Sequence, residues 1–181
     1  MPEQQGRRLR ASIRAFGDAA GRPLVFKNLV CALRIGPIAD ALPEAVFVRI
    51  RRDLLATTTS LLAGRKALYG DYGCWWSSEP PQIDRLRALP PHEQVVEQVL
   101  SIEELIDADL DDIGQDRFNE LTYETLCEDA GAALRGIAAL AGRNGFSLAP
   151  RMEVPSSLER SSPAPIDPDL HGRLVEYIRG R

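Results

Sequence analysis

The stretch from Ala45 to Leu62, AVFVRIRRDLLATTTSLL, constrains the fold more than any other part of the chain. Residues 46–50 carry the β-branched and aromatic side chains that are typical of a buried strand. Asp53 follows at the position of a helix N-cap, because its carboxylate can accept hydrogen bonds from the unpaired amides of the first helical turn. The leucines beyond Asp53 recur with the helical period, so we expect a strand, a tight corner and a helix.

Two polar side chains flank this corner. Arg52 leaves the end of the strand, and Ser60 lies about two turns along the helix, on the side opposite the leucines. A guanidinium and a hydroxyl beside a helix N-terminus favour a phosphate-binding site. The alternative from the residues alone is a solvated basic corner, since Arg49 and Arg51 stand next to Arg52.

The rest of the chain alternates short apolar runs with amphipathic segments. This pattern predicts an α/β fold with a parallel sheet flanked by helices. The expected strands are residues 24–26, 46–50 and 118–123, and the expected helices are residues 7–20, 28–41 with a break at Gly36-Pro37, 54–66, 92–113, 127–141 and 171–178. We expect residues 1–148 to form the α/β domain and the Pro/Ser-rich residues 149–181 to form an arm and a short helix of the same domain.

Composition excludes several classes of function. The net charge of −4 gives no electrostatic footprint for nucleic acid. No apolar run is long enough for a transmembrane helix, and the first residues lack the apolar region of a secretory signal. The three cysteines lack the spacing of a metal site. The acidic cluster at residues 107–112 lacks the order of ligands found in an EF-hand loop, so we expect it to be a solvated face. We therefore expect a cytoplasmic protein that needs no metal.

Several motifs, in order, resemble those of sulfotransferases that use 3′-phosphoadenosine 5′-phosphosulfate (PAPS) as the sulfuryl donor. Residues 26–28, Phe-Lys-Asn, look like the family's fxKN/D segment, and residues 43–45, Pro-Glu-Ala, look like its fP-x-A segment. Arg52 with Ser60 resembles the 3′-phosphate-binding motif, and residues 121–126, LTYETL, look like vxYExL. The resemblance covers roughly residues 20–145 and includes features of the tyrosylprotein sulfotransferases. It implies part of the P-loop-type, three-layer α/β sulfotransferase fold.

The resemblance also implies roles for single residues. Arg52 and Ser60 would hold the 3′-phosphate of PAPS. Lys27 looks like a catalytic lysine near the transferring sulfuryl group, where an ammonium stabilises developing negative charge. Tyr123 looks like a nucleotide-contacting tyrosine, and Ser156, or its neighbour Ser157, resembles a serine in a late loop that covers the nucleotide. The alternatives are a surface lysine, a core tyrosine and a linker serine.

Arg65 is a further nucleotide-binding candidate with a weaker match. The resemblance places a second arginine one turn beyond the serine, but Gly64 holds that position and Arg65 follows it. The alternative is a positive charge that complements the helix C-terminus. Two adjacent tryptophans, Trp75 and Trp76, either contact an acceptor or anchor the long loop over residues 69–91.

The chain lacks a motif that the family uses. It contains neither a GxxxxGK[ST] match nor another Gly/Ser/Thr-rich loop for the 5′-phosphosulfate, and the family's usual base is absent with it. We expect this chain to start after that first strand and helix, which leaves an open sheet edge. Three alternatives follow: a sulfotransferase whose N-terminal part lies on a separate chain or was lost from the gene model, a non-catalytic relative that binds nucleotide weakly or not at all, or an α-helical adaptor that binds a protein partner. A separate N-terminal fragment or a homo-oligomer would cover the open sheet edge. The acceptor would be a small molecule, a carbohydrate or a peptide.

Neither histidine, His92 or His171, stands where the family places a base, and both are expected to be exposed.

Overall fold

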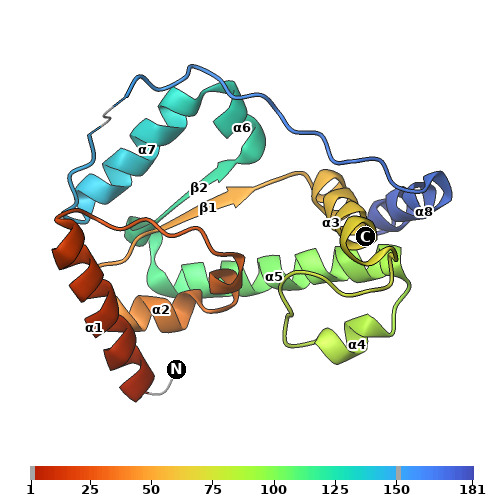
Figure 1. The fold of residues 1–181 in the computed structure, drawn as a ribbon, viewed down its shortest axis with the longest axis horizontal. Helices are drawn as coiled ribbons and strands as arrows, with labels where there is room; N and C mark the ends of the chain where they lie inside the picture. The colour runs from red at the N-terminus through yellow and green to blue at the C-terminus, as the bar shows by residue number, and fades with distance from the viewer. Residues whose placement is uncertain (1–2, 150–151) are drawn as a thin grey trace. The chain divides into compact units, whose positions relative to one another are not determined.

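The computed structural model describes residues 3–149 and 152–181, which form two compact units (Figure 1). Unit 1 comprises residues 1–51 and 106–158, and unit 2 comprises residues 52–105 and 159–181. The long helix α5 (Pro91–Ile113) contributes residues to both units. This division differs from the predicted one at residue 148, because residues 159–181 cluster with residues 52–105.

Unit 1 is built on a short parallel sheet. Strands β1 (Phe47–Arg51) and β2 (Phe118–Thr122) pair in register, with Arg49 opposite Glu120. The helices of this unit are α1 (Glu3–Ala20), η1 (Leu29–Leu33), α2 (Ile35–Ala41), η2 (Gln115–Arg117), α6 (Tyr123–Glu128) and α7 (Ala130–Arg143). Helix α7 packs on β2, and α1 packs on α2 (Figure 1). The α/β class and the parallel sheet flanked by helices are therefore confirmed.

Polar contacts join β1 and α2 to the acidic part of α5. The Arg49 side chain is 8% exposed and forms ion pairs with Asp107 and with Glu120, the latter at 3.0 Å. Asp109 accepts a hydrogen bond of 2.8 Å from the backbone N–H of Gly36 at the start of α2. Two members of the acidic cluster thus have structural partners, and the whole cluster is not simply a solvated face.

A second arginine, Arg117 of η2, contacts the turn before β1. Arg117 donates to the carbonyl oxygens of Leu42 and Ala45 at 3.0 and 2.9 Å. Its guanidinium also lies 5.9 Å from the ring centroid of Phe47. These contacts satisfy carbonyl groups that no helix or strand uses, which positions the beginning of β1.

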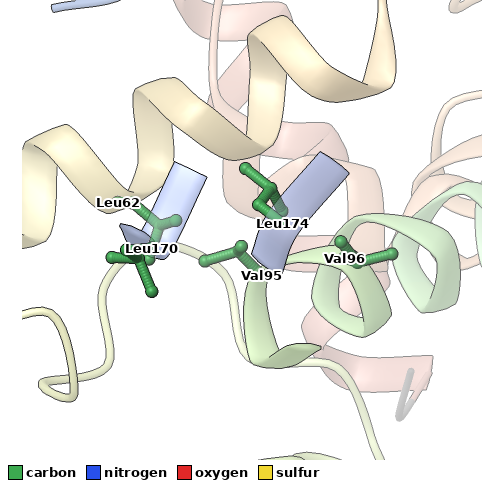
Figure 2. Close-up of a cluster of buried hydrophobic side chains, with 5 residues drawn as sticks. All are labelled: Leu62, Val95, Val96, Leu170 and Leu174. Carbon is green, nitrogen blue, oxygen red and sulfur yellow. The ribbon is translucent and has the colours of Figure 1, made fainter. Parts of the chain in front are cut away.

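Unit 2 is helical. It contains α3 (Leu54–Tyr69), α4 (Ile83–Arg87), the first part of α5 and α8 (Pro168–Arg179). Figure 2 shows its core, where α3, α5 and α8 contribute Leu62, Val95, Val96, Leu170 and Leu174. Helix α3 ends at Gly70, whose φ of 71° is a left-handed conformation that glycine adopts without a steric penalty.

Three local predictions are wrong. Residues 24–26 form no strand, and Val25 is 89% exposed. The predicted helix over residues 28–41 is broken at Arg34 instead of Gly36-Pro37, because Pro37 lies in the first turn of α2, where a missing N–H costs nothing. Tyr123 is the first residue of α6 and not the last residue of β2. The Thr122 side chain caps α6, because its hydroxyl accepts a hydrogen bond from the backbone N–H of Thr125.

Candidate functional site

The corner between β1 and α3 has the predicted local structure. Asp53 is the N-cap of α3, and its carboxylate accepts a hydrogen bond of 2.8 Å from the backbone N–H of Ala56. This confirms the predicted helix start. The carboxylate also brings a negative charge to the helix terminus, so an anion bound at this corner must depend on side-chain donors more than on the first-turn amides.

Arg52 and Ser60 are the side-chain donors at this corner. Both are half-buried. The axial rise between them is about 12 Å if the helical repeat is applied to all eight residues. A phosphate bound by both side chains would lie between Arg52 and Ser60 along the helix axis. The Arg52 side chain would then have to extend toward Ser60. In this structure the Arg52 guanidinium donates a hydrogen bond to the carbonyl oxygen of Ser161.

A groove of about 500 Å³ lies beside the first two turns of α3. One wall is the helix face that carries Asp53, Ala56 and Thr59, and Ser60 directly follows that face. The other wall is the proline-rich segment 163–168, joined by His171. The groove therefore lies between the late Pro/Ser segment and α3, the helix that carries Ser60 and that Arg52 precedes.

The residues of the late segment were only partly identified from the sequence. Ser156 is the predicted nucleotide ligand, but the backbone of Ser161 contacts Arg52. The run Glu159-Arg160-Ser161 indicated this segment, and Ser161 lies five residues after Ser156 in the same Pro/Ser-rich arm. Spacing alone did not identify which serine would lie at the arginine.

Arg65 lies in the core of unit 2 and is 0% exposed. It donates hydrogen bonds to the Gln94 side-chain oxygen at 2.8 Å, to the Gln98 side-chain oxygen at 3.3 Å and to the Tyr72 carbonyl at 3.2 Å. Its guanidinium lies 5.2 Å from the Trp75 ring centroid. Burial lowers the pKa of Arg65 to about 10, because the charged form loses its hydration. This arrangement gives Arg65 a structural role, and its predicted contact with a nucleotide has no support in the geometry.

Gly64 explains why an arginine is absent one turn beyond Ser60. A Cβ atom at this position would lie 2.2 Å from the Trp76 ring, which is far inside a van der Waals contact. Trp76 packs against α3, and its carbonyl accepts a hydrogen bond from the Gln98 side chain at 3.0 Å. The two tryptophans therefore contact α3 and support the interpretation that they anchor the long loop.

His92 lies in a second hollow of unit 2, of about 360 Å³. It is buried, so the prediction that it is exposed is wrong, whereas His171 is exposed as predicted. The imidazole meets the Tyr177 ring edge to face at 6.2 Å. Burial lowers the pKa of His92, an effect that Glu93 opposes and Arg173 reinforces. Pro91 begins α5, and the first turn of this helix places His92 against Tyr177 of α8.

The remaining predicted residues belong to unit 1. Lys27 is exposed and directly precedes Asn28, the N-cap of η1. Tyr123 is half-buried at the start of α6, and Ser156 is exposed in the late coil. Their joint action with Arg52 and Ser60 stays a prediction.

Metal-ligand clusters and membrane-spanning helices are both absent from the described residues. Within residues 3–149 and 152–181, no group of three or more His, Cys, Asp or Glu side chains could hold a metal ion. In the same ranges, no helix is both long and apolar enough to span a membrane.

Comparison with known proteins identifies the family. Residues 4–146 match the family model described as "Sulfotransferase family". No curated protein and no solved structure matches the chain. The family match spans 143 of the 181 residues and contains the β1–α3 corner with Arg52 and Ser60. This chain therefore belongs to the sulfotransferase family.

Proposed function

We propose that this chain binds PAPS and takes part in transfer of its sulfuryl group to an acceptor hydroxyl or amine. The proposal depends chiefly on one observation, the placement of Arg52 and Ser60 at the start of α3, inside the family match. A guanidinium can bind a phosphate through two parallel charge-assisted hydrogen bonds, and a hydroxyl adds a third. The groove beside the first two turns of α3 is lined mostly by aliphatic and proline side chains, an environment suited to an apolar face of a nucleoside.

Lys27 has the chemistry for the transfer step. Sulfuryl transfer increases negative charge on the bridging oxygen and the peripheral oxygens, and a fixed ammonium stabilises that charge. Lys27 is exposed at the end of an extended segment, so its amine is accessible. We propose that Lys27 approaches the sulfuryl group and that Tyr123 and Ser156 contact the nucleotide. No metal is needed in this scheme.

The sequence contains no Gly/Ser/Thr-rich loop for the 5′-phosphosulfate, so the scheme includes a partner. We propose that a separate polypeptide supplies the missing backbone amides. The alternative function is a nucleotide-binding or interaction module without transfer activity. Among the described residues β1 has a strand neighbour on one side only, and this observation favours a partner in both cases.

Calorimetric titration of adenosine 3′,5′-bisphosphate tests the nucleotide site. We expect binding, and we expect Arg52→Ala to cost about 1.5–3 kcal/mol, the usual contribution of a hydrogen bond to a charged group. This corresponds to a roughly 10- to 150-fold higher dissociation constant. Adenosine 5′-monophosphate, which lacks the 3′-phosphate, should bind weakly to the wild type and equally weakly to Arg52→Ala.

Lys66→Ala is the matched control. Lys66 lies on the same helix and carries the same charge, but its amine donates to the Gly70 carbonyl at the far end of α3. Equal losses of affinity in Lys66→Ala and Arg52→Ala would indicate a general charge effect, and an unchanged dissociation constant in Arg52→Ala would contradict the assignment. Transfer is then measured separately, as release of adenosine 3′,5′-bisphosphate from PAPS.

A further inference from the structure

The outer edge of β1 is an unpaired sheet edge bordered by exposed apolar side chains. Among the described residues, β1 pairs with β2 on one side and with no strand on the other. Val48 and Ile50 alternate along one face of β1 and are 39% and 51% exposed. Parallel strands are normally covered on both faces and read as buried apolar runs, so this exposure is unusual.

A second segment of unit 1 lacks a strand partner. Residues 24–26, Leu-Val-Phe, have the composition of a buried strand, but in the described chain their backbone groups form no hydrogen bond. Val25 and Phe26 are 89% and 65% exposed. Unit 1 thus contains two β-forming segments that face solvent, one as an open sheet edge and one as an extended coil.

The opposite face of β1 indicates which charge an incoming strand should carry. The buried Arg49 pairs with the more exposed Asp107 and Glu120, whereas the Arg51 side chain is 46% exposed and lies 3.6 Å from Glu120. Glu120 is therefore shared by two guanidinium groups. A carboxylate placed beside Arg51 by a new strand would add a favourable cross-strand pair.

A second copy of this edge is disfavoured in the two registers centred on Ile50 and on Arg49. Two β1 strands related by a two-fold axis pair antiparallel, and when that axis passes through Ile50, Arg49 of each copy lies opposite Arg51 of the other. When the axis passes through Arg49, the two Arg49 residues lie opposite each other. Like charges directly opposite each other destabilise a pair of strands.

We propose that the edge of β1 binds an extended segment of a different polypeptide by β-strand addition. Its side chains alternate between apolar residues, which cover Val48 and Ile50, and acidic residues, which lie beside Arg51. Main-chain hydrogen bonds supply affinity and the alternating side chains supply specificity, as in other strand-addition complexes. This inference does not depend on the nucleotide site, because none of its residues binds the phosphate.

The probe is a pair of synthetic peptides. The glutamate peptide is acetyl-Thr-Val-Glu-Val-Glu-Val-Thr-amide, and the lysine peptide replaces both glutamates with lysine. Each is titrated into the ¹⁵N-labelled full chain without nucleotide. We expect the glutamate peptide to bind more tightly, with saturable amide shifts in residues 47–51 and 24–26.

Two substitutions separate this site from unspecific binding. Ile50→Asp should weaken the glutamate peptide by about tenfold or more, because it removes a large apolar contact. Leu134→Asp is the matched control, since Leu134 is 44% exposed on α7, and it should leave the affinity unchanged. Arg51→Glu should reverse the preference in favour of the lysine peptide. Circular dichroism and thermal unfolding confirm that each variant is folded.

The outcomes that overturn the proposal are distinct. They are absence of saturable binding by either peptide, shifts confined to other residues, an equal loss in Leu134→Asp, and an unchanged preference in Arg51→Glu. Self-association of the chain that Ile50→Asp abolishes, measured by sedimentation, would assign the edge to a second copy instead. Because no nucleotide is present, failure here leaves the bisphosphate titration unaffected, and the reverse also holds.

Discussion

Replacing Arg65 by methionine tests whether the buried guanidinium stabilises unit 2. Arg65 is fully buried and donates to two glutamine oxygens and one backbone carbonyl. Methionine has a long, unbranched side chain without a strong donor, so these three acceptors would lose their charged partner while most of the volume stays filled. We expect the free energy of unfolding to fall by about 3 kcal/mol.

This magnitude results from two opposing effects. An unsatisfied buried acceptor costs about 1–3 kcal/mol, so three of them cost about 6 kcal/mol at the middle of that range. The substitution also removes a buried charge, so the free energy that was lost on burying this charge is regained. The pKa of Arg65 falls from 12.5 to about 10. At about 1.36 kcal/mol per pKa unit, burial of the charge costs about 3 kcal/mol.

Urea denaturation followed by circular dichroism measures the effect. Lys66→Met is the control, because Lys66 is the exposed neighbour on the same helix, and its free energy of unfolding should change by no more than about 0.5 kcal/mol. A loss below about 1 kcal/mol in Arg65→Met, with an unchanged m-value, would refute the structural role, since it would lie within the range of ordinary surface substitutions.

The same variant separates stability from binding. If Arg65 acts only in the core, folded Arg65→Met binds adenosine 3′,5′-bisphosphate with the dissociation constant of the wild type. A tenfold weaker affinity, at a temperature where the variant is fully folded, would restore the nucleotide role that the sequence predicts. Gln94→Leu provides a further check, because the two substitutions should be non-additive if the pair acts as a unit.

Two further predictions concern the same unit. Gly64→Ala should lower the free energy of unfolding by about 1–3 kcal/mol, the typical cost of overpacking, because the new methyl group collides with the Trp76 ring. Urea denaturation measures this loss, and the loss should disappear in a Trp76→Leu background. Stability should fall as the pH is lowered from 7 to 5, because the folded state holds the pKa of His92 below its ordinary value of 6.5 and the unfolded state therefore binds the proton first. His92→Gln should flatten this pH dependence, and an identical slope in both proteins would show that other groups cause it.

Local patterns were sufficient to predict the corner at the centre of the chain. Asp53 caps α3 as its position indicates, and Leu62 enters the core with the expected helical period. Both predictions depend on interactions within a few residues, such as the cap between Asp53 and Ala56. The sequence contains all the information for contacts at this range.

The role of Arg65 could not be predicted in this way. Its side-chain partners, Gln94 and Gln98, lie 29 and 33 residues further along the chain. An arginine near a helix C-terminus is ordinarily exposed and complements the helix dipole, so local reasoning favoured a surface charge or a ligand contact. Only the tertiary packing of α3 against α5 shows that the guanidinium is buried. The sequence therefore predicted the helix that carries the candidate site better than it predicted which of its polar residues remain open to a ligand.

Helix α3 consequently divides into two parts with different expected effects on function. Arg52 just before its N-cap and Ser60 in its second turn are half-buried donors, whereas the next turns hold Gly64 and Arg65 in packed contacts. Because no second guanidinium is available one turn beyond Ser60, the phosphate would depend on a single arginine. Neutralising one charge should then remove most of the preference for a 3′-phosphate, and the remaining affinity should depend little on salt, because few charged contacts are left to screen. A strong salt dependence that persists in Arg52→Ala would show that another cation binds the phosphate, and Lys27 would be the first residue to replace.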